Sequence, residues 1–250
     1  MKLSLITATY NSANTLKPCL ESVINQDYSN IEYLMVDGGS KDETVSILNE
    51  SQNQFSNLHW VSEPDKGIYD ALNKGVSMAT GDVIGFVHSD DFLSEPTIIS
   101  QIMAEFNSKR VQGVYGDLHY IDKQNENKVI RTWKSCDFSP KLLQNGWMPP
   151  HPTLFLKKEV YQKHKGFNLD YKIAADYDFM LRVLQDPQLK FSYLPKVITK
   201  MRVGGASNRS LKNIIAKSRE DYSAIKKNKL AYPIWVLCAK NISKIPQFFK

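Results

Sequence analysis

LSLITATYNSANTLKPCLESVINQDYSNIEYLMVDGGSKDET, residues 3–44, is the stretch that decides the fold. Its first part, 3–10, is an apolar run that predicts a buried strand. In residues 14–26 the apolar positions recur every three or four residues, which is the period of a helix. A second apolar run at 31–37 predicts another strand, and two glycines follow it. The stretch therefore predicts a strand, a helix and a second strand in close succession.

The same alternation continues to residue 106. The next helix, expected at 40–50, begins with Ser40 and has Glu43 three residues later, which is the capping-box pattern. Pro96 suits the first turn of a later helix. The further elements expected are strands at 58–63 and 82–88 and helices at 67–79 and 95–106. Repeated strand–helix units predict an α/β fold with a mainly parallel central sheet and helices on both faces.

The chain after residue 112 is less regular. A proline-rich loop leads into a strand within 145–158, and a helix is expected at 175–185. The other elements expected are a strand at 113–122, two paired strands at 189–195 and 196–203, and a long basic helix at 211–229. We therefore expect one domain over 1–207, divided near residue 112, followed by a basic helical tail at 208–250.

The composition is that of a globular protein, since 42% of the residues are hydrophobic and 23% are charged. Cys19, Cys136 and Cys238 form no CxxC pair, which argues against a zinc site or a disulfide framework and favours a reducing, cytoplasmic compartment. The N-terminus lacks the continuous apolar segment of a secretory signal. The longest apolar run near the other end, 234–239, is far shorter than the roughly 20 residues of a membrane span.

The net charge of +6 comes from the tail. Residues 208–250 contain ten Lys or Arg and two acids, whereas residues 1–207 contain 22 basic and 24 acidic residues. A nucleic-acid-binding protein would present basic residues over its body. The slightly acidic body argues against that class. The basic tail is either a surface for anionic lipid or a solvated helix face.

Polar residues gather where the predicted strands end. The clusters are Thr7-Ala8-Thr9-Tyr10, Asp37-Gly38-Gly39, Asp65-Lys66-Gly67 and His88-Ser89-Asp90-Asp91. In open α/β sheets, ligands bind outside the carboxyl ends of the strands. The sequence contains neither GxGxxG after the first strand nor GxxxxGK[ST], so it lacks the dinucleotide and P-loop phosphate motifs. The clusters predict a binding site of another kind at this edge.

Several acids have both a structural and a chemical interpretation. The adjacent Asp90 and Asp91 repel each other unless something positive or water lies there. They either hold magnesium or manganese, or Asp91 or Ser94 caps the next helix. Asp37 either accepts hydrogen bonds from a ribose or a pyrimidine, or only shapes its turn. A glycosidase would also use two acids, but it would need no nucleotide pocket.

Two further acids begin the helix expected at 175–185. Asp178 has Arg182 four residues later, a spacing typical of a surface ion pair. Asp176 has no such partner, because position 180 is Met. Asp176 is therefore either a favourable acid at a helix N-terminus or a general base.

These pieces, in this order, resemble glycosyltransferase family 2, the inverting GT-A enzymes that use nucleotide sugars. The resemblance covers about residues 3–205 and includes "DKGIYDALNKGVSMATGDVIGFVHSDDF" and "AADYDFMLRV". "YGDLHYID" and "MPPHPTLFLKKEVY" are similar to the bacterial branch that builds colanic-acid-type and other surface polysaccharides. The resemblance implies a GT-A domain with a nucleotide-sugar-binding half at about 1–112 and an acceptor-binding half at about 113–207.

The resemblance implies roles for the polar residues at matching positions. Asp176 matches the acid of the ED motif, the catalytic base, and follows Ala175 where many members have Glu. Asp90 matches the last acid of the DxD metal motif, whose first position is His88 here. A divalent cation, Mn2+ or Mg2+, would be held by His88, Asp90 and Asp91. The donor would be bound by Thr7, Thr9, Tyr10, Asp37, Asp65, Lys66, Ser89 and Asp90.

The resemblance also implies the reaction. The QxxRW motif of processive synthases is absent, so one sugar, from a UDP-sugar by preference, would be transferred with inversion. The cation and Lys66 would stabilise the leaving diphosphate. The acceptor would be a glycan, commonly polyprenyl-diphosphate-linked, of an O-antigen, capsule or exopolysaccharide. A non-catalytic nucleotide-sugar-binding protein, which would not need Asp176, is the alternative.

The acceptor half and the tail give further expectations. Acceptor-side candidates are Asp117, Trp147 and His151, each of which could instead be a packing or turn residue. Residues 204–207 either close over the site or form a turn. One helical face of the tail contains Ile234, Trp235, Cys238, Ile242, Ile245 and Phe249. Through 230–250 this face would lie on the cytoplasmic side of the inner membrane, or else pack on the body or on a second copy.

Overall fold

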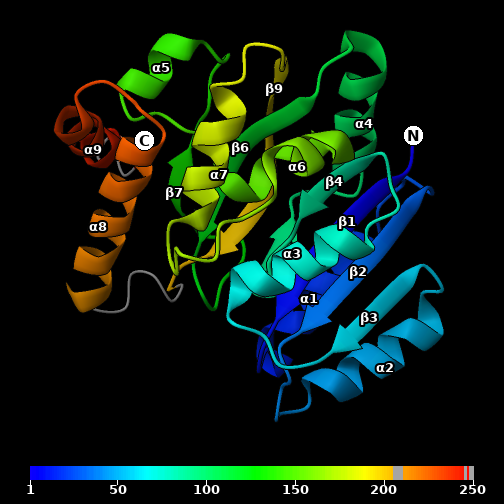
Figure 1. Cartoon of the computed structure of the whole chain (residues 1–250). Helices are drawn as coiled ribbons and strands as arrows, with labels where there is room; N and C mark the ends of the chain where they lie inside the picture. The colour runs from blue at the N-terminus through cyan, green and yellow to red at the C-terminus, as the bar shows by residue number, and fades with distance from the viewer. Residues whose placement is uncertain (205–210, 245–246, 248–250) are drawn as a thin grey trace.

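The computed structural model describes residues 1–204, 211–244 and 247, and its first half alternates strands and helices as predicted. Figure 1 shows these elements in blue and cyan. They are β1 (Leu3–Thr9), α1 (Ala13–Ile24), β2 (Ile31–Asp37), α2 (Thr44–Gln54), β3 (Leu58–Ser62), α3 (Ile68–Met78) and β4 (Val83–Phe86). The predicted bounds differ from these by a few residues, except for β2, which matches at both ends.

One sheet extends through the molecule in the order β3-β2-β1-β4-β8-β6-β9-β5, and β7 pairs with β6 outside this path. The later strands are β5 (Asp91–Leu93), β6 (Gly113–Ile121), β7 (Val129–Trp133), β8 (Phe155–Lys157) and β9 (Phe191–Arg202). Strands β1 to β4 are parallel, whereas β8 is antiparallel to both β4 and β6. Parallel strands point the same way, so β1, β2 and β4 end at one edge of the sheet.

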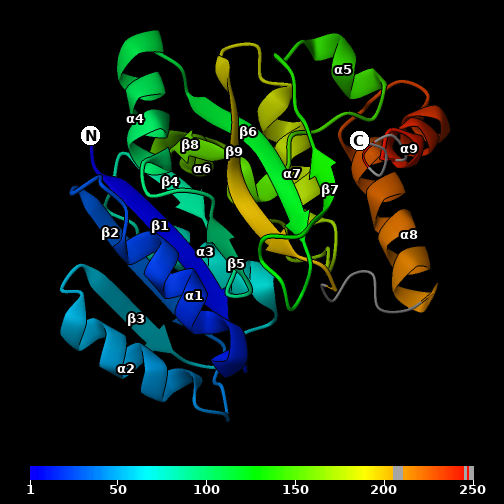
Figure 2. The same ribbon diagram turned by 180° about the vertical axis from the view of Figure 1, so that it is seen from behind.

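Helices cover both faces of this sheet, as Figures 1 and 2 show from opposite sides. Alternate residues of β1 enter two separate cores because side chains of a strand alternate between faces. Leu5 packs in the core that contains residues of α1, α2 and α4 (Ile98–Lys109). Ile6 packs in the core with α3, α6 (Lys158–His164) and α7 (Ala175–Leu184). Burial on both faces explains the near-continuous apolar sequence of β1 and β2.

Four smaller or later elements complete the chain. They are α5 (Pro140–Gln144), the 3-10 turn η1 (His151–Thr153), α8 (Leu211–Lys227) and α9 (Pro233–Ile242). Helix α8 contacts both α7 and α9, and Figure 1 shows this pair beside β7, on the side of the molecule away from β3. None of the helices in the described part of the chain is both long and apolar enough to pass through a bilayer.

Three local predictions were wrong. The single strand β9 (Phe191–Arg202) stands where two paired strands were predicted at 189–195 and 196–203. Pro195 lies where the β6–β9 register shifts, and a proline at such a bulge resembles a strand break in the sequence. Ser40 does not begin a helix, since its hydroxyl binds the Asp37 carboxylate and α2 starts at Thr44. Pro96 precedes α4 instead of lying in its first turn.

Candidate functional site

The carboxyl ends of the parallel strands bring the first polar clusters together. Thr9, the last residue of β1, pairs in register with Asp37, the last residue of β2. Asp37 in turn pairs with Ser62 at the end of β3. The loop after β4 adds Ser89, whose hydroxyl lies 3.0 Å from that of Ser12 at the start of α1. The predicted clusters therefore lie along one edge of the sheet.

Asp37 is fully buried, and its carboxylate accepts hydrogen bonds from the loop that follows it and from β3. Oδ2 accepts hydrogen bonds from the Gly39 and Ser40 backbone amides at 3.1 and 2.9 Å and from the Ser62 hydroxyl at 2.6 Å. The Ser40 hydroxyl binds the other oxygen. Asp37 thus fixes the backbone that follows β2, which agrees with the turn interpretation of this residue.

Tyr10, Gly38 and Asp65 form the surface beside this loop. Tyr10 is 62% exposed. A Cβ atom on Gly38 would lie only 2.5 Å from Asp65 Oδ2 and 3.4 Å from Tyr10 Cδ2, so glycine allows the loop to approach both side chains. Lys66 is exposed on the following turn. These residues form the part of the predicted donor site that solvent can reach.

Thr7 and Thr9 differ although both are buried on β1. The Thr7 hydroxyl donates to the Val87 carbonyl at 2.5 Å and lies 3.0 Å from the Tyr33 hydroxyl. Its hydrogen bonds are therefore made inside the core. The Thr9 hydroxyl finds no hydrogen-bond partner in the described residues. Of these two residues predicted to bind the sugar donor, only Thr9 has a hydroxyl without a partner among the described residues that could hydrogen-bond a ligand.

The loop between β4 and β5 contains the three predicted metal ligands. The Nδ1 atom of His88 is buried and unpartnered within the described chain. Burial lowers the pKa of His88, although Asp90 and Asp176 act in the opposite direction. The imidazole is therefore held neutral, with a nitrogen lone pair that could bind a cation. Asp90 is half-buried, and its backbone carbonyl accepts a hydrogen bond from the Arg202 guanidinium at 2.8 Å.

Asp91 is fully buried at the start of β5. Its Oδ1 accepts a hydrogen bond from the Arg202 backbone amide at 3.2 Å, and its Oδ2 has no partner among the residues described. Burial, helped by the charge of Asp90, raises the pKa of Asp91 well above its usual range. Neither Asp91 nor Ser94 caps α4, because the N-cap is Thr97 and the Ser94 hydroxyl binds the Val197 carbonyl.

These residues fit a cation that a ligand helps to hold. No group of three or more His, Cys, Asp or Glu residues is arranged as a metal site in the described part of the chain. Magnesium and manganese usually take few protein ligands and complete their shell with water and phosphate oxygens. The unpartnered His88 Nδ1 and Asp91 Oδ2 are buried atoms of the kind that a ligand satisfies. Asp90 lies between them in the sequence.

Asp176 lies in the first turn of α7. Its Oδ1 accepts hydrogen bonds from the Tyr69 hydroxyl at 3.2 Å and the Tyr177 backbone amide at 2.8 Å. Helix α7 contacts the turn η1, and the ring of His151 in that turn lies 6.0 Å from the ring of His88. The fold thus places the predicted base and the predicted metal-binding loop near each other, although they are far apart in the sequence.

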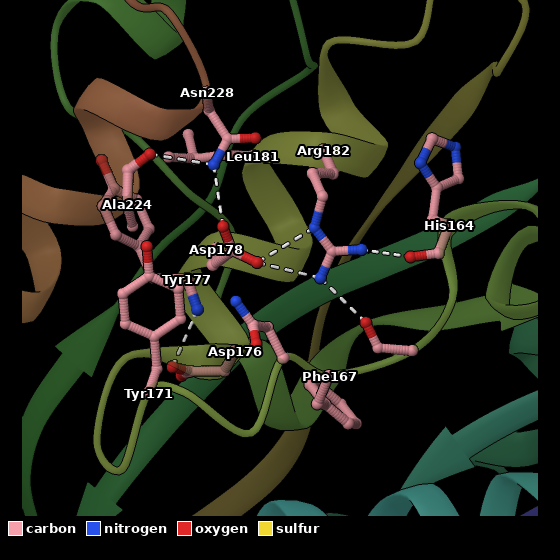
Figure 3. A network of polar contacts seen from close by, with 12 residues as sticks. His164, Phe167, Tyr171, Asp176, Tyr177, Asp178, Leu181, Arg182, Ala224 and Asn228 are labelled. Carbon is pink, nitrogen blue, oxygen red and sulfur yellow. Dashed lines mark hydrogen bonds and ion pairs between the residues drawn. The ribbon is translucent and has the colours of Figure 1, made fainter.

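Asp178 pairs with Arg182 as predicted (Figure 3), but its carboxylate is buried, whereas the Arg182 side chain is 27% exposed. Asp178 is 2% exposed, and its Oδ2 lies 2.9 Å from Arg182 Nη2. Asn228 of α8 donates to Oδ1 at 2.9 Å. The surface prediction was wrong because α8 covers this part of α7, and spacing within one helix does not reveal what packs on it.

Glu220 of α8 is a residue that sequence reasoning missed. Its carboxylate accepts hydrogen bonds from the backbone amides of Lys172 at 3.2 Å, Ile173 at 2.8 Å and Ala174 at 2.9 Å. It therefore holds the backbone that leads directly into Asp176. The only available signal was an acid in an otherwise basic segment.

The acceptor-side candidates lie in different surroundings. Asp117 accepts hydrogen bonds at Oδ1 from the Ser135 amide at 2.7 Å and the Tyr193 hydroxyl at 2.9 Å, so it serves the fold. His151 is buried between Phe86 and His88, with ring centroids 5.6 and 6.0 Å away, and burial lowers its pKa to about 4. Trp147 is one wall of a separate cavity. The structure does not gather the three at one place.

Comparison with known proteins identifies the class. The model of the glycosyl transferase family 2 matches residues 4–174. An uncharacterized glycosyltransferase of Mycobacterium tuberculosis is 34% identical over 182 residues, which are 72% of this chain and 68% of that protein. A PGL/p-HBAD biosynthesis glycosyltransferase of Mycobacterium bovis is 31% identical over 207 residues, 82% of this chain and 78% of that protein. The chain belongs to glycosyl transferase family 2 and is a transferase enzyme.

Solved structures show the same GT-A fold. S. aureus TarS 1–349, crystallised in complex with UDP-GlcNAc, superposes with a TM-score of 0.71 at 18% identity, over 97% of this chain and 73% of that one. The mannosyltransferase PcManGT from Pyrobaculum calidifontis, in complex with GDP-Man and Mn2+, gives 0.69 at 19% identity, over 99% and 72%. At these identities the likeness shows the fold, and the GT-A prediction is confirmed.

Proposed function

We propose that this enzyme transfers one sugar, non-processively and with inversion, from a UDP-sugar to a hydroxyl of a glycan acceptor. The observation that carries the proposal is the position of Asp176, which is bound by Tyr69 in the first turn of α3, the helix that follows Asp65. Its helix also contacts the turn of His151, whose ring lies beside that of His88. The donor would lie over the edge of the sheet where the parallel strands end. The solved complexes of TarS with UDP-GlcNAc and of PcManGT with GDP-Man and Mn2+ support this class of donor.

His88 and Asp90, with Asp91 behind them, would hold a divalent cation beside the donor diphosphate. When bound, Mn2+ or Mg2+ supplies positive charge that stabilises the leaving diphosphate. Asp65 and Tyr10 would position the nucleoside part of the donor, and exposed Lys66 would add a second positive charge near the phosphates. The neutral His88 ring presents its unpartnered nitrogen rather than a competing positive charge.

Asp176 would act as the general base for the acceptor hydroxyl. The Tyr69 hydroxyl and the Tyr177 amide both bind Oδ1, which orients the carboxylate and leaves Oδ2 to take the proton. A positioned general base contributes about 10²- to 10⁴-fold to a rate. The attack would come from the side opposite the leaving diphosphate, so the anomeric configuration inverts.

The test separates binding from transfer. A panel of nucleotide sugars is first screened for an increase in melting temperature, with and without Mn2+. Asp176→Asn should then lower turnover about 10²- to 10⁴-fold while keeping the donor-induced shift; exposed Asp170→Asn, in the same loop region, is the control. Full turnover in Asp176→Asn would remove the base assignment. Donor binding by the wild type without any transfer would favour a non-catalytic nucleotide-sugar-binding protein.

We propose further that the acceptor is polyprenyl-diphosphate-linked and belongs to a bacterial surface polysaccharide, such as an O-antigen. Helix α9 would bring the enzyme to the cytoplasmic face of the inner membrane. Its Val236 is buried, whereas Ile234, Trp235 and Ile242 are 68%, 60% and 61% exposed. This agrees with both earlier interpretations, since one face packs on the body and the predicted apolar face points to solvent. Ile245 and Phe249 lie outside the described residues, as do most of residues 204–207.

Co-sedimentation with vesicles tests the membrane contact. Apolar side chains on an interfacial helix bind in proportion to the area they bury, and basic residues add attraction to anionic lipid. Trp235→Ser together with Ile242→Ser should reduce binding to phosphatidylglycerol vesicles, whereas Ile68→Ser, an exposed isoleucine on α3, should not. Equal binding of all three proteins would remove the membrane contact and leave the transferase proposal untouched.

A further inference from the structure

A cavity of about 500 Å³ lies between β7, the segment before η1 and helix α9. Its walls include Trp133, Lys134, Trp147, Lys240, Lys244 and Gln247. Helix α9 is held against this segment by a close backbone contact at Gly146. That residue has φ +68°, and a Cβ there would lie 2.4 Å from the Lys240 backbone nitrogen. The close contact at Gly146 therefore fixes the position of α9, which forms one wall of the cavity.

Lys240, which lines the cavity, is buried and shares one buried carboxylate with Lys217. The Lys240 side chain is 4% exposed, and its Nζ lies 2.6 Å from Asp221 Oδ1. Lys217 pairs with the other oxygen of the same carboxylate at 2.9 Å. Nζ of Lys240 also lies 3.4 Å from the centroid of the Tyr177 ring. One buried carboxylate therefore serves two lysines.

Lys244, one turn further along α9, adds a cation with no acidic partner among the described residues. Burial, together with neighbouring positive charges and against the effect of Asp221, lowers the pKa of Lys240 to about 7 and that of Lys244 to about 8. Burying an unpaired charge is costly, and an anion in the cavity would offset that cost. Lys134 lies at the rim and is exposed.

The walls suit a sugar next to that anion. The Trp147 indole stacks on Phe138 with ring centroids 5.9 Å apart and meets Tyr115 edge-on at 5.8 Å, so it is rigidly held. Trp133 forms another wall. Flat aromatic surfaces with a few charged groups are typical of sites that orient a small ligand.

The cavity adjoins the proposed catalytic base. Tyr177, whose ring lies under Lys240, follows Asp176 directly in α7. An acceptor with its hydroxyl at Asp176 could therefore reach this cavity with another part of the same molecule.

We propose that this cavity binds the phosphate or diphosphate group of the acceptor, with Lys244 on the anion, the Lys240–Asp221 pair behind it, and Trp133 and Trp147 beside the sugar. The assignment rests on the proposed function, because it takes Asp176 as the acceptor side. The anion could belong to a lipid-linked glycan or to a soluble sugar phosphate, and both present the same chemistry to the lysines.

Calorimetric titration of the full chain in EDTA tests the site without relying on transfer. The probes are inorganic pyrophosphate and farnesyl diphosphate. Lys244→Gln should weaken the binding of both about tenfold, which is the loss of one charge-assisted hydrogen bond, and Lys244→Arg should retain most of it. Lys226→Gln removes the same charge from an exposed position on α8 and should bind as the wild type does. Lys134→Gln, at the exposed rim, is a second variant with little risk to folding.

The outcomes separate the possibilities. Tighter binding of farnesyl diphosphate than of pyrophosphate supports a lipid-linked acceptor, and equal binding supports a soluble one. Equal affinities of Lys244→Gln and Lys226→Gln for both probes would overturn the site, as would a wild type that binds neither probe. Loss of the donor-induced melting shift in Lys244→Gln would show that the cavity belongs to the donor and would also overturn the acceptor assignment. A failure of the Asp176 test with intact probe binding would contradict only the proposed reaction.

Discussion

The two ends of the parallel strands differ in whether some of their buried polar atoms lack hydrogen-bond partners. At the amino-terminal end, Glu32 of β2 is 6% exposed and has several partners. It pairs with Lys2 Nζ at 2.6 Å and accepts hydrogen bonds from the Thr80 hydroxyl at 2.5 Å and the Gly81 amide at 3.1 Å. Burial favours a raised pKa, but the hydrogen bonds from Lys2, Ser4 and Thr80 outweigh it and lower the pKa of Glu32 to about 2.

At the carboxyl-terminal end, three buried polar atoms have no partner within the described chain. They are Thr9 Oγ1, His88 Nδ1 and Asp91 Oδ2. Buried polar groups in proteins are nearly always hydrogen-bonded, and exceptions often lie where a ligand or ion binds. The hydrogen bonds of the amino-terminal cluster are made within the fold, whereas the three unpartnered atoms at the carboxyl-terminal end are available to the ligand that we propose. Substitutions at the two ends should therefore affect different measurements.

The largest effect is expected from Asp90→Ala. Removal of this carboxylate would leave the cation and the leaving diphosphate poorly held, and the turnover number should fall about 10²- to 10³-fold. The free energy of unfolding should stay within about 0.5 kcal/mol, because the side chain is only half-buried. Steady-state transfer and urea unfolding measure the two quantities. An Asp90→Ala variant that is strongly destabilised yet fully active would show that this end of the strands stabilises the fold instead of binding a ligand.

Glu32→Gln should have the opposite profile. Loss of the charge leaves Lys2 without its partner and weakens the hydrogen bonds, so the free energy of unfolding should fall by about 2 kcal/mol at neutral pH. The folded-state pKa is lowered, so this stabilisation is present above the unfolded value of roughly 4.3. It should disappear as the pH falls toward 2. Urea unfolding across this pH range tests the sign, and transfer at low temperature should be unchanged.

Glu220→Gln should act on catalysis through position. A weaker acceptor for the amides before Asp176 should lower the turnover number about tenfold, in line with a loss of roughly 1.4 kcal/mol, and leave the donor-induced melting shift intact. Glu159→Gln, on the surface of α6, is the matched control. If Glu220→Gln lowers the melting temperature but leaves turnover normal at low temperature, then Glu220 only stabilises the contact between α7 and α8.

The smallest effect distinguishes two threonines on one strand. Thr7→Val removes a hydroxyl with partners and should destabilise the fold by about 1 kcal/mol. Thr9→Val removes an unpartnered buried hydroxyl and should leave the stability unchanged or raise it by about 0.5 kcal/mol. The donor-induced melting shift should decrease only in Thr9→Val. Equal changes in stability would show that the two sites do not differ.

Much of this molecule could be predicted from the sequence. The period of apolar residues located β1, α1 and β2, because their burial is set by the strand or helix itself. Asp176 and Asp90 could be chosen as candidates because each lies at one end of a clearly predicted helix or strand. The spacing of residues could not predict a role that depends on contact with a distant segment of the chain. Glu220 and Asn228 act on α7 from α8, so no local pattern indicates either role.

The cavity at α9 shows the same limit. The sequence identifies the tail as basic and partly apolar. It does not reveal that Lys240 points inward against Tyr177 while Trp235 points outward. Which side of a short helix packs on the body depends on the surface that receives it. Gly146, whose contact fixes that surface, is far from the tail in the sequence.

A crystal soaked with UDP and Mn2+ and measured at the manganese absorption edge tests the central claim most directly. We expect an anomalous peak beside Asp90 and His88, with the diphosphate on the far side of the ion and the uridine toward Tyr10 and Asp65. Nucleotide and manganese bound elsewhere, for example in the cavity with Lys240 and Lys244, would contradict that claim.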